Sequence, residues 1–473
     1  MTEAPSVVVI GGGIAGLAAA FELHTRAIPF VLLEASDRLG GLIFSEQVDG
    51  FTIDAGADSL LVQKRAGIEF CEALGLGSRL MPSTPPRTAF VHARGRLHKL
   101  PSPSILGIPT TEAGIAAYDL LPETARATLL ARTREPRNPR TTEPGSPGTP
   151  EPPEDESVAD FFRREFGPET VGLIAEPLLG GIHAGDVERL SIASVAPRLA
   201  AHGRVRGRAM RDLLDSTQPQ TQSDGLFRSL PRGMGEIVEA VEQRIPSSSI
   251  RRRSAVRSIA RADDDWRVGS TSGDVTARAV VIAAPAHAAA EMLSPIDRDI
   301  AALCAAVPYV STASVALAWP RADVHHPLDG SGFVVARQHS DLRITACTWA
   351  SSKWPNRTPP GMSLLRAFLG GATDPDAASL SDGEILGIAV RDVSRVLGIQ
   401  SSPALARVHR WIRAGAQHNV GHRARVEDLE RRLERAPGLF VAGSGFRSIG
   451  VPDCIADGRA AARRALDYAK IAP

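Results

Sequence analysis

The sequence predicts an α/β fold in three parts: a parallel-sheet domain made of separated segments, a second domain with a mixed sheet, and an inserted helical domain. The apolar runs Val7–Ile10 and Phe30–Leu33 predict the first part, because short continuous apolar runs are typical of buried parallel strands. The helical stretch between them completes a strand–helix–strand unit. With 473 residues, of which 43% are hydrophobic, the chain is long enough for two or three domains.

The predicted domain boundaries follow changes of pattern along the chain. The parallel-sheet domain takes in 1–80, 225–295 and 430–473, and the mixed-sheet domain 81–101 and 296–429. The second domain is predicted from alternating apolar strands such as SVALAW and SLLRAFLGG.

The inserted helical domain, 102–215, is interrupted by a proline-rich segment, 132–157, which contains seven prolines. Such a segment cannot bury enough apolar surface to offset its ordering entropy, so we predict that it is disordered or a linker. A helix is predicted directly after it, with Ser157 as the N-cap and Gly167 at the end. A shorter polar break at 216–225 closes the domain.

Charge and cysteine content exclude several classes of protein. The formal net charge is +1, which gives no indication of nucleic-acid binding. The four cysteines are far apart, without a CxxC pair or a metal-ligand spacing, so we expect reduced thiols and no metal site. No apolar stretch approaches the ~20 residues that span a bilayer, and the N-terminus has no basic region of a signal peptide. We therefore expect a cytoplasmic protein that is soluble or bound peripherally to the membrane.

Three glycines, Gly11, Gly13 and Gly16, form a GxGxxG motif between the first strand and the helix. Glu34 ends the next strand, 18 positions after Gly16. Glycines at this spacing permit a tight turn and let the helix N-terminus approach a pyrophosphate, while the carboxylate accepts from ribose hydroxyls. The context predicts a dinucleotide site, and a glycine-rich packing turn is the alternative. The helix residues expected to line this site are Ile14 and Ala15.

The segment ASDRLGGLI, which follows Glu34, resembles the second glycine signature of the FAD-dependent amine oxidase and protoporphyrinogen oxidase superfamily. The resemblance implies that Arg38, Gly40 and Gly41 contact the cofactor diphosphate. A surface salt bridge is the alternative for Arg38. The segment DAGADSL resembles the superfamily's next cofactor segment. Its residues implied to contact FAD are Gly56, Ala57, Asp58 and Ser59.

The C-terminal segment GLFVAGSGFRSIGVPDCIADG predicts a strand, Leu439–Ala442, that ends at Gly443, and a helix that begins near Val451. A helix N-terminus stabilises negative charge, and reduced flavin carries charge near N1 and O2, so flavin is favoured over nicotinamide. The resemblance adds Val256 and Pro452 as cofactor contacts and implies noncovalent FAD. The first domain is then a discontinuous Rossmann-like FAD-binding domain.

Several separated segments narrow the resemblance to the family of protoporphyrinogen oxidase and its bacterial relative that oxidises coproporphyrinogen. These segments are EPLLGGIHAGDVERLSI, PRGMGEIVEAV, KWPNR, AFLGG and GVPDCI. The resemblance implies oxidation of protoporphyrinogen IX or coproporphyrinogen III to the porphyrin in haem biosynthesis. Six electrons would leave as three hydride transfers to flavin N5, each with loss of a pyrrole N–H proton. O₂ would reoxidise the flavin and yield H₂O₂. The sequence does not separate the two substrates.

The segment EPLLGG has neither a strand before its glycines nor a helix N-terminus after them, so it does not match a phosphate loop. In the family this stretch lines the wall of the tetrapyrrole pocket. The resemblance therefore implies that Gly180, Gly181 and Ala184 bring backbone against a flat ring. A loop between two helices is the alternative.

The resemblance places Arg87 at a substrate propionate, because the planar guanidinium can bind both carboxylate oxygens. An exposed arginine at a strand start is the alternative. Phe368 matches the aromatic that stacks on a pyrrole, although a strand aromatic is also typical of a core. Ala336 and Thr345 fall where the family has larger aliphatic residues, which implies a wider slot or a different alignment.

Two other classes of flavoprotein share parts of the pattern. An amine oxidase would place a lysine near flavin N5, and Lys353 is the candidate for that role. A carotenoid desaturase differs at GVPDCI. A non-catalytic flavoprotein that carries a tetrapyrrole is the third alternative. We assign no catalytic side chain, since no Ser/His/Asp or Cys/His set is apparent and the cofactor carries the chemistry. Peripheral membrane contact through 102–214, a homodimer, and hand-over of product to ferrochelatase are further expectations.

Overall fold

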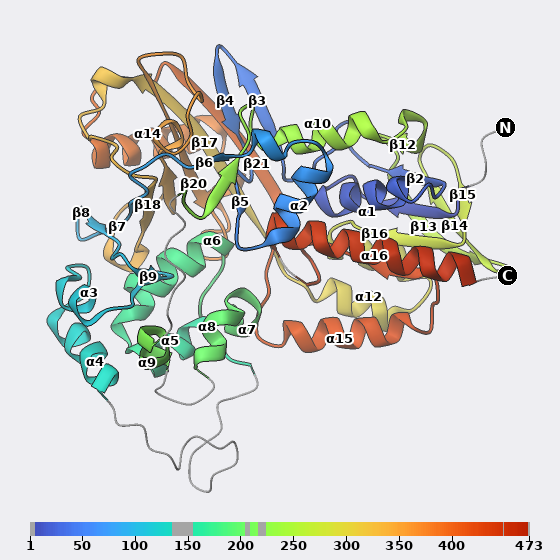
Figure 1. Cartoon of the computed structure of the whole chain (residues 1–473), viewed down its shortest axis with the longest axis horizontal. Coiled ribbons are helices and arrows are strands. Elements are labelled where there is room, and N and C mark those ends of the chain that lie inside the picture. Colours follow the sequence, from blue (N-terminus) through green and yellow to red (C-terminus); the bar gives the residue numbers. More distant parts are fainter. Residues whose placement is uncertain (1–4, 135–154, 204–208, 216–223, 448, 472–473) are drawn as a thin grey trace, which may run out of the picture. The chain divides into compact units, whose positions relative to one another are not determined.

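The computed structural model describes residues 5–134, 155–203, 209–215, 224–447 and 449–471 (Figure 1). The chain forms two compact units. The first consists of Met1–Ser83, Leu226–Tyr309 and Arg423–Pro473, and the second of Thr84–Gly225 and Val310–His422. The segments predicted for nucleotide binding lie in the first unit, and the helical insertion and the mixed sheet lie together in the second.

A five-stranded parallel sheet forms the centre of the first unit, in the order β12-β2-β1-β16-β22. The strands are β1 (Val7–Ile10), β2 (Phe30–Leu33), β12 (Ile250–Arg251), β16 (Ala279–Ile282) and β22 (Leu439–Val441). The predicted strands β1 and β2 are confirmed with their bounds, and all their residues are buried. β1 pairs in parallel with both β2 and β16, which confirms the α/β fold.

Helices α1 (Ile14–Thr25) and α16 (Val451–Ile471) pack closely against each other in this unit. A Cβ at Gly458 would lie 2.0 Å from the carbonyl oxygen of Ala15, so only glycine allows this approach. The helix predicted to begin near Val451 is confirmed.

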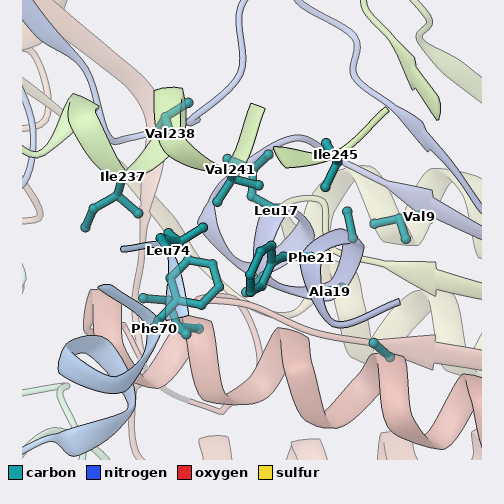
Figure 2. Close-up of a cluster of buried hydrophobic side chains, with 14 of the residues drawn as sticks. Val9, Leu17, Ala19, Phe21, Phe70, Leu74, Ile237, Val238, Val241 and Ile245 are labelled. Carbon is teal, nitrogen blue, oxygen red and sulfur yellow. The ribbon is translucent and has the colours of Figure 1, made fainter. Parts of the chain in front are cut away.

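An apolar cluster fixes α1 on the sheet (Figure 2). Leu17 and Phe21 of α1 meet Phe70 of α2 (Arg65–Ala73), and the rings of Phe21 and Phe70 lie edge to face with centroids 5.5 Å apart. Helix α10 (Gly235–Arg244) closes the cluster. Burying large side chains of this kind contributes roughly 1.5–3 kcal/mol each, and here it holds the start of α1 at the end of β1.

Smaller elements complete the first unit. The strands are β3 (Ser45–Val48), β4 (Phe51–Asp54), β5 (Leu60–Leu61), β6 (Met81–Pro82), β11 (Phe227–Ser229), β13 (Val256–Ala262), β14 (Asp265–Ser270) and β15 (Val275–Ala277). The remaining helices are α11 (Ala286–Leu293), α12 (Arg298–Ala305) and α15 (His422–Leu433), with short 3₁₀ turns at Gly77–Arg79 and Ser247–Ser249.

A seven-stranded mixed sheet forms the second unit, in the order β21-β17-β20-β19-β18-β7-β8. The strands are β7 (Ala89–Ala93), β8 (Arg96–Lys99), β17 (Tyr309–Pro320), β18 (Gly332–Val335), β19 (Ala346–Thr348), β20 (Met362–Gly370) and β21 (Leu405–Ala416). β18 and β7 are parallel, whereas β20 is antiparallel to its neighbours. The predicted mixed sheet is confirmed.

The two faces of this sheet differ in character. Leu365, Ala367 and Leu369 of β20 are buried in an apolar cluster with α14 (Asp382–Leu397). Because side chains alternate along a strand, Arg366 and Phe368 belong to the opposite face. That face carries the predicted ring-stacking aromatic.

The helical part of the second unit contains eight short helical segments among the described residues. They are α3 (Glu112–Ala117), α4 (Glu123–Arg134), α5 (Val158–Phe166), the π-helix η3 (Val171–Gly180), α6 (Gly181–His183), α7 (Ile192–Val195), α8 (Pro197–His202) and α9 (Ala209–Asp215). Short elements elsewhere in this unit are β9 (Ser104–Ile105), β10 (Ile108–Pro109), α13 (Ala350–Lys353), η5 (Arg321–Asp323), η6 (Arg337–His339) and η7 (Ala377–Ser379). The predicted helix α5 is confirmed, with Ser157 accepting a hydrogen bond from Asp160 N and Gly167 at the C-cap.

The predicted disorder of 132–157 is wrong at both ends of the segment. Helix α4 continues to Arg134, and Asp155 accepts hydrogen bonds from Ser191 Oγ at 2.6 Å and from Gly421 N at 2.9 Å. Side-chain and backbone donors therefore fix the end of the segment despite its polar composition. Residues 135–154, and 216–223 of the second polar break, lie outside the described residues. Across the described chain, no helix is long and apolar enough to cross a membrane.

Candidate flavin and substrate site

The turn from β1 to α1 can be made only with glycine at two positions. Gly11 has φ of +101°, and a Cβ there would lie 2.8 Å from the carbonyl oxygen of Ala283. A Cβ at Gly16 would lie 1.8 Å from the carbonyl oxygen of Gly11. These two glycines therefore serve the tight turn and its packing.

Gly13 differs from its two neighbours, because a Cβ there would meet no heavy atom within 4 Å. Helix α1 begins directly after it, with no side chain capping its first turn. The N–H groups of a first helical turn lack partners within the helix, and together with the helix dipole they bind anions. The open space at Gly13 fits a cofactor diphosphate at Ile14 and Ala15, which a packing turn alone would not require.

The second glycine signature lies beside the first. Gly40 N donates a hydrogen bond of 2.8 Å to Gly12 O, and Gly13 and Gly40 form an isolated parallel β-bridge. A Cβ at Gly41 would lie 3.1 Å from the Cα of Gly13. The two segments predicted to hold the diphosphate therefore form one surface.

Arg38 braces the second glycine turn. Its guanidinium donates to Gly41 O at 2.7 Å and to Leu39 O at 3.3 Å, and it lies 5.0 Å from the ring centroid of Phe44. These contacts give Arg38 a role in shaping the turn. Its contact with a diphosphate stays a prediction.

Glu34 binds the backbone of both glycine segments. Its Oε2 accepts from Gly12 N at 2.6 Å, and its Oε1 accepts from Ser36 N at 2.8 Å and from Ser36 Oγ at 2.7 Å. Ser254 N donates to Glu34 O at 2.8 Å, which places Val256 two residues from this strand end. The predicted ribose acceptor therefore lies where the two signatures meet, and it also shapes the loop.

The segment with Gly56, Ala57, Asp58 and Ser59 follows β4. Ser59 Oγ donates to Asp58 Oδ1 at 2.7 Å, and Ser229 Oγ donates to Asp58 O at 2.7 Å. These bonds tie the segment to β11 of the first unit.

Asp54 fixes the start of this segment and was not predicted from the sequence. Its Oδ1 accepts from Ser45 Oγ at 2.5 Å and from Met234 N at 2.8 Å. The bond to Met234 joins the segment to the PRGMGE turn before α10. Sequence separation hides this contact, because Asp54 and Met234 are 180 positions apart.

The C-terminal part of the site depends on a second residue that the sequence did not indicate, Asp457. Gly443, with φ of +109°, donates its N–H to Asp457 Oδ2 at 2.7 Å, and Arg447 donates to Asp457 Oδ1 at 2.6 Å. Burial raises the pKa of the Asp457 carboxyl, while Arg447 and the Gly443 N–H act in the opposite direction. Asp457 therefore holds the end of β22 against α16.

The N-terminus of α16 carries an ion pair between Lys64 and Asp453. A Cβ at Gly67 would lie 3.0 Å from Pro452, so the segment around Lys64 packs on the start of this helix. Lys64, and not the predicted Lys353, is therefore the lysine at the start of α16. Lys353 lies in the second unit, 5.1 Å from the ring centroid of Trp354.

Cys454 follows this ion pair and is 5% exposed. Burial raises the pKa of its thiol to about 12. A thiol of this kind stays protonated at neutral pH and is a poor nucleophile. This favours noncovalent cofactor binding.

In the second unit, the alternative of a loop between two helices at EPLLGG is wrong. Gly180 ends the π-helix η3 and Gly181 begins α6, so both lie in helical backbone. A Cβ at Gly180 would lie 3.2 Å from Gly185 O, whereas a Cβ at Gly181 would meet no atom within 4 Å. Ile182, next to Gly181, is 64% exposed although it is apolar. Gly181 and Ile182 therefore form the exposed part of this segment, while Gly180 packs inside the unit.

One end of the mixed sheet brings together three predicted substrate contacts, Ala184, Thr345 and Phe368. Ala184 O accepts from Ala372 N at 2.8 Å, just beyond β20. Thr345 donates both its N–H and its hydroxyl to Phe368 O, at 2.8 and 3.3 Å. The half-buried ring of Phe368 lies 4.8 Å from the guanidinium carbon of Arg366.

Ala336 is fully buried in the apolar cluster between the sheet and the helices, and its N–H donates to His92 O at 3.0 Å. Its methyl group is therefore part of the core.

Arg87 lies at the other end of the sheet face. A Cβ at Gly225 would lie 2.4 Å from Arg87 Nε, so the guanidinium stem packs on that glycine. Arg87 precedes β7, whose first residue, Ala89, pairs with Gly332 of β18, whereas Phe368 lies on β20, which β19 separates from β18. The two predicted substrate contacts are therefore not neighbours, and only a broad ligand could reach both.

A glycine turn between a buried parallel strand and a helix, with a second helix N-terminus in the same unit, is the arrangement of a dinucleotide-binding oxidoreductase. The sequence profile of the flavin containing amine oxidoreductase family matches residues 14–466, and the chain belongs to this family.

Curated relatives are similar over nearly the whole length of the chain. "Coproporphyrinogen III oxidase" of Bacillus subtilis is 34% identical over 98% of both chains, and that of Staphylococcus aureus is 29% identical over 98% of this chain and 99% of its own. A solved structure from Exiguobacterium sp. 255-15, "Putative protoporphyrinogen oxidase", has a TM-score of 0.84 and 28% identity over 99% of this chain and 100% of its own. UDP-galactopyranose mutase, at 18% identity, has a TM-score of 0.72 over 98% of this chain and 96% of its own, and shares the fold.

Proposed function

We propose that this protein oxidises coproporphyrinogen III to coproporphyrin in haem biosynthesis, with noncovalent FAD as cofactor and O₂ as electron acceptor. The observation that carries the cofactor part of the proposal is the open space at Gly13, where two glycine signatures adjoin. Similarity over 98% of the chain to curated coproporphyrinogen III oxidases supports this substrate. Protoporphyrinogen IX is the second candidate, because a chloroplast protoporphyrinogen oxidase of Spinacia oleracea is 26% identical over 98% of this chain and 84% of its own.

The residues of the first unit would bind and orient the cofactor. The first turn of α1 would hold the diphosphate, and Glu34 would accept from the adenosine ribose. The N-terminus of α16, with Lys64 beside it, would face the flavin end, where positive potential stabilises the reduced form. When bound, flavin supplies hydride acceptance, which no side chain can provide.

The residues of the second unit would bind the substrate. Arg87 would pair with a propionate, Phe368 would stack on a pyrrole, and the backbone at Gly181 would lie against the ring. The small side chains near Gly181 would leave room for a broad ligand.

The decisive experiment compares both porphyrinogens with purified protein and measures fluorescent porphyrin. We expect turnover of both, with a higher kcat/KM for coproporphyrinogen III. Tetrapyrrole binding without turnover would support the carrier alternative, and turnover of amines alone would support an amine oxidase.

We also propose that the protein works in the cytoplasm and contacts the membrane peripherally through 102–214, since protoporphyrin, the less polar of the two candidate products, would gain from it. Hand-over to ferrochelatase and a homodimer belong to the same proposal. Recovery of all the protein in the soluble fraction at moderate salt would contradict the membrane contact.

A further inference from the structure

Three neighbouring strands of the parallel sheet end at the edge where the flavin is proposed to bind. β1, β16 and β22 are adjacent and parallel, so the turns that follow them meet at their carboxyl ends, where open parallel sheets bind ligands. The turn after β16 packs on the first glycine turn, because a Cβ at Gly11 would lie 2.8 Å from Ala283 O. The turn after β22 packs on the start of α1, because a Cβ at Gly443 would lie 3.5 Å from the Ala15 methyl group.

The hydroxyl group of Tyr309 lies between the turns after β16 and β22. It accepts a hydrogen bond of 2.8 Å from the N–H of Ala286, the first residue of α11. A Cβ at Gly445, in the turn after β22, would lie 2.5 Å from the same hydroxyl oxygen and 3.0 Å from the Cβ of Ala286. Glycine at position 445 therefore leaves the space that the hydroxyl group fills.

The surroundings of Tyr309 fix its ring and keep its hydroxyl group uncharged. The half-buried ring lies edge to face with the ring of His287, with centroids 4.8 Å apart. Burial raises the pKa of Tyr309 to about 12, and the bond from Ala286 N lowers it in part. The hydroxyl group is therefore protonated at neutral pH. The turn after β22 is held at Gly443 by Asp457 and at Gly445 by its contact with Tyr309.

We propose that Tyr309 is a cofactor-positioning residue, whose hydroxyl group holds the turns after β16 and β22 in the arrangement that receives FAD. The inference rests on the proposed function, since it requires flavin at this edge of the sheet. Without the hydroxyl group, the two turns would have to be ordered as the cofactor binds, and this ordering would lower the affinity. The bond from Ala286 alone would limit Tyr309 to the start of α11, whereas the contact with Gly445 extends its role to the turn that leads to α16.

The first test is FAD titration of the full-length Tyr309→Phe apoprotein. We expect the affinity to fall by about three- to tenfold, the change that loss of one hydrogen bond brings. The visible circular dichroism of the bound flavin should also change. Tyr468→Phe is the matched control, because Tyr468 lies on α16 in the same unit and packs on Gly438, at the opposite end of β22. It should leave affinity and spectrum unchanged.

Gly445→Ala gives a second test, in which the direction of the change decides. Gly445 is not among the glycines with positive φ, so the added methyl group is itself the perturbation. It would meet the Tyr309 hydroxyl group, and we expect at least about a tenfold loss of FAD affinity. In the double variant the hydroxyl group is absent and leaves room for the methyl group. Its FAD affinity should therefore exceed that of Gly445→Ala alone, whereas the losses from independent substitutions would multiply.

Equal FAD affinity in Tyr309→Phe and wild type would overturn the inference and leave the proposed function standing. Losses that multiply in the double variant would do the same, as would a Tyr309→Phe protein in which only the urea midpoint of the apoprotein falls. A wild type that binds no flavin would instead remove the proposed function, and the inference with it. If Gly445→Ala does not fold, the titration of Tyr309→Phe against Tyr468→Phe decides.

Discussion

The N–H of Gly12 donates a 2.6 Å hydrogen bond to Glu34 Oε2. Through this bond the carboxylate at the end of β2 holds the first glycine loop, and through Ser36 it holds the start of the second. The predicted ribose acceptor is therefore also a structural element of the diphosphate site.

Glu34→Ala should lose both functions. Removing a partner from buried polar groups costs roughly 1–3 kcal/mol, so we expect a largely flavin-free protein on purification. Glu34→Gln should retain part of the affinity, because its amide oxygen can still accept one of the backbone N–H groups. The measurement is flavin content and FAD titration of the apoprotein. Full occupancy in Glu34→Ala would show that the site lies elsewhere.

Gly13→Ala and Gly16→Ala form a matched pair in the same turn. Gly13 has extended backbone angles that alanine adopts, and its Cβ direction is open, so Gly13→Ala should fold normally and lose at least about tenfold in FAD affinity. Gly16→Ala should destabilise the apoprotein by roughly 1–3 kcal/mol or more, because its Cβ meets the Gly11 carbonyl. Urea unfolding and FAD titration separate the two effects. Equal FAD affinity in Gly13→Ala and wild type would contradict a diphosphate at this position.

Arg87→Ala tests the substrate assignment. Loss of a charge-assisted bond to a propionate should cost about 1.5–3 kcal/mol, or roughly ten- to a hundredfold in kcat/KM, with flavin content unchanged. Arg87→Lys should recover part of the loss, since ammonium keeps the charge but not the planar fork.

The control for Arg87 is a porphyrinogen with esterified propionates. The wild type should bind it poorly, and Arg87→Ala should not weaken it further. If free-acid and esterified substrates lose the same factor, Arg87 acts through its packing on Gly225 and the pocket is misplaced.

Acid precipitation tests the linkage of the cofactor. The buried, protonated thiol of Cys454 gives no nucleophile at the start of α16, so all yellow colour should pass to the supernatant. Flavin that stays on the pellet would reveal a covalent bond.

Local patterns predicted the parts of the site that depend on sequence neighbours. The strands Val7–Ile10 and Phe30–Leu33, the helix start at Val451 and the cap at Ser157 follow from periodicity and short-range hydrogen bonds. The contacts that hold the site together were not predicted. Lys64 and Asp453 are 389 positions apart, and no local signal connects them.

The π-helix η3 shows a different limit. Glycines and Pro177 in EPLLGG favour a loop by local propensity, but the segment is helical because its apolar side chains are buried against the sheet and α5. Tertiary burial outweighed local propensity in this segment. Contacts between distant residues also order the end of the proline-rich segment, since Asp155 accepts hydrogen bonds from Ser191 and Gly421.

The most direct test of porphyrinogen oxidation is anaerobic mixing of the purified holoprotein with coproporphyrinogen III, followed by admission of O₂. The account predicts bleaching of the flavin absorbance without oxygen, and then about three equivalents of H₂O₂ for each coproporphyrin formed, since two electrons leave in each round. Flavin that remains oxidised in the presence of both coproporphyrinogen III and protoporphyrinogen IX would contradict it.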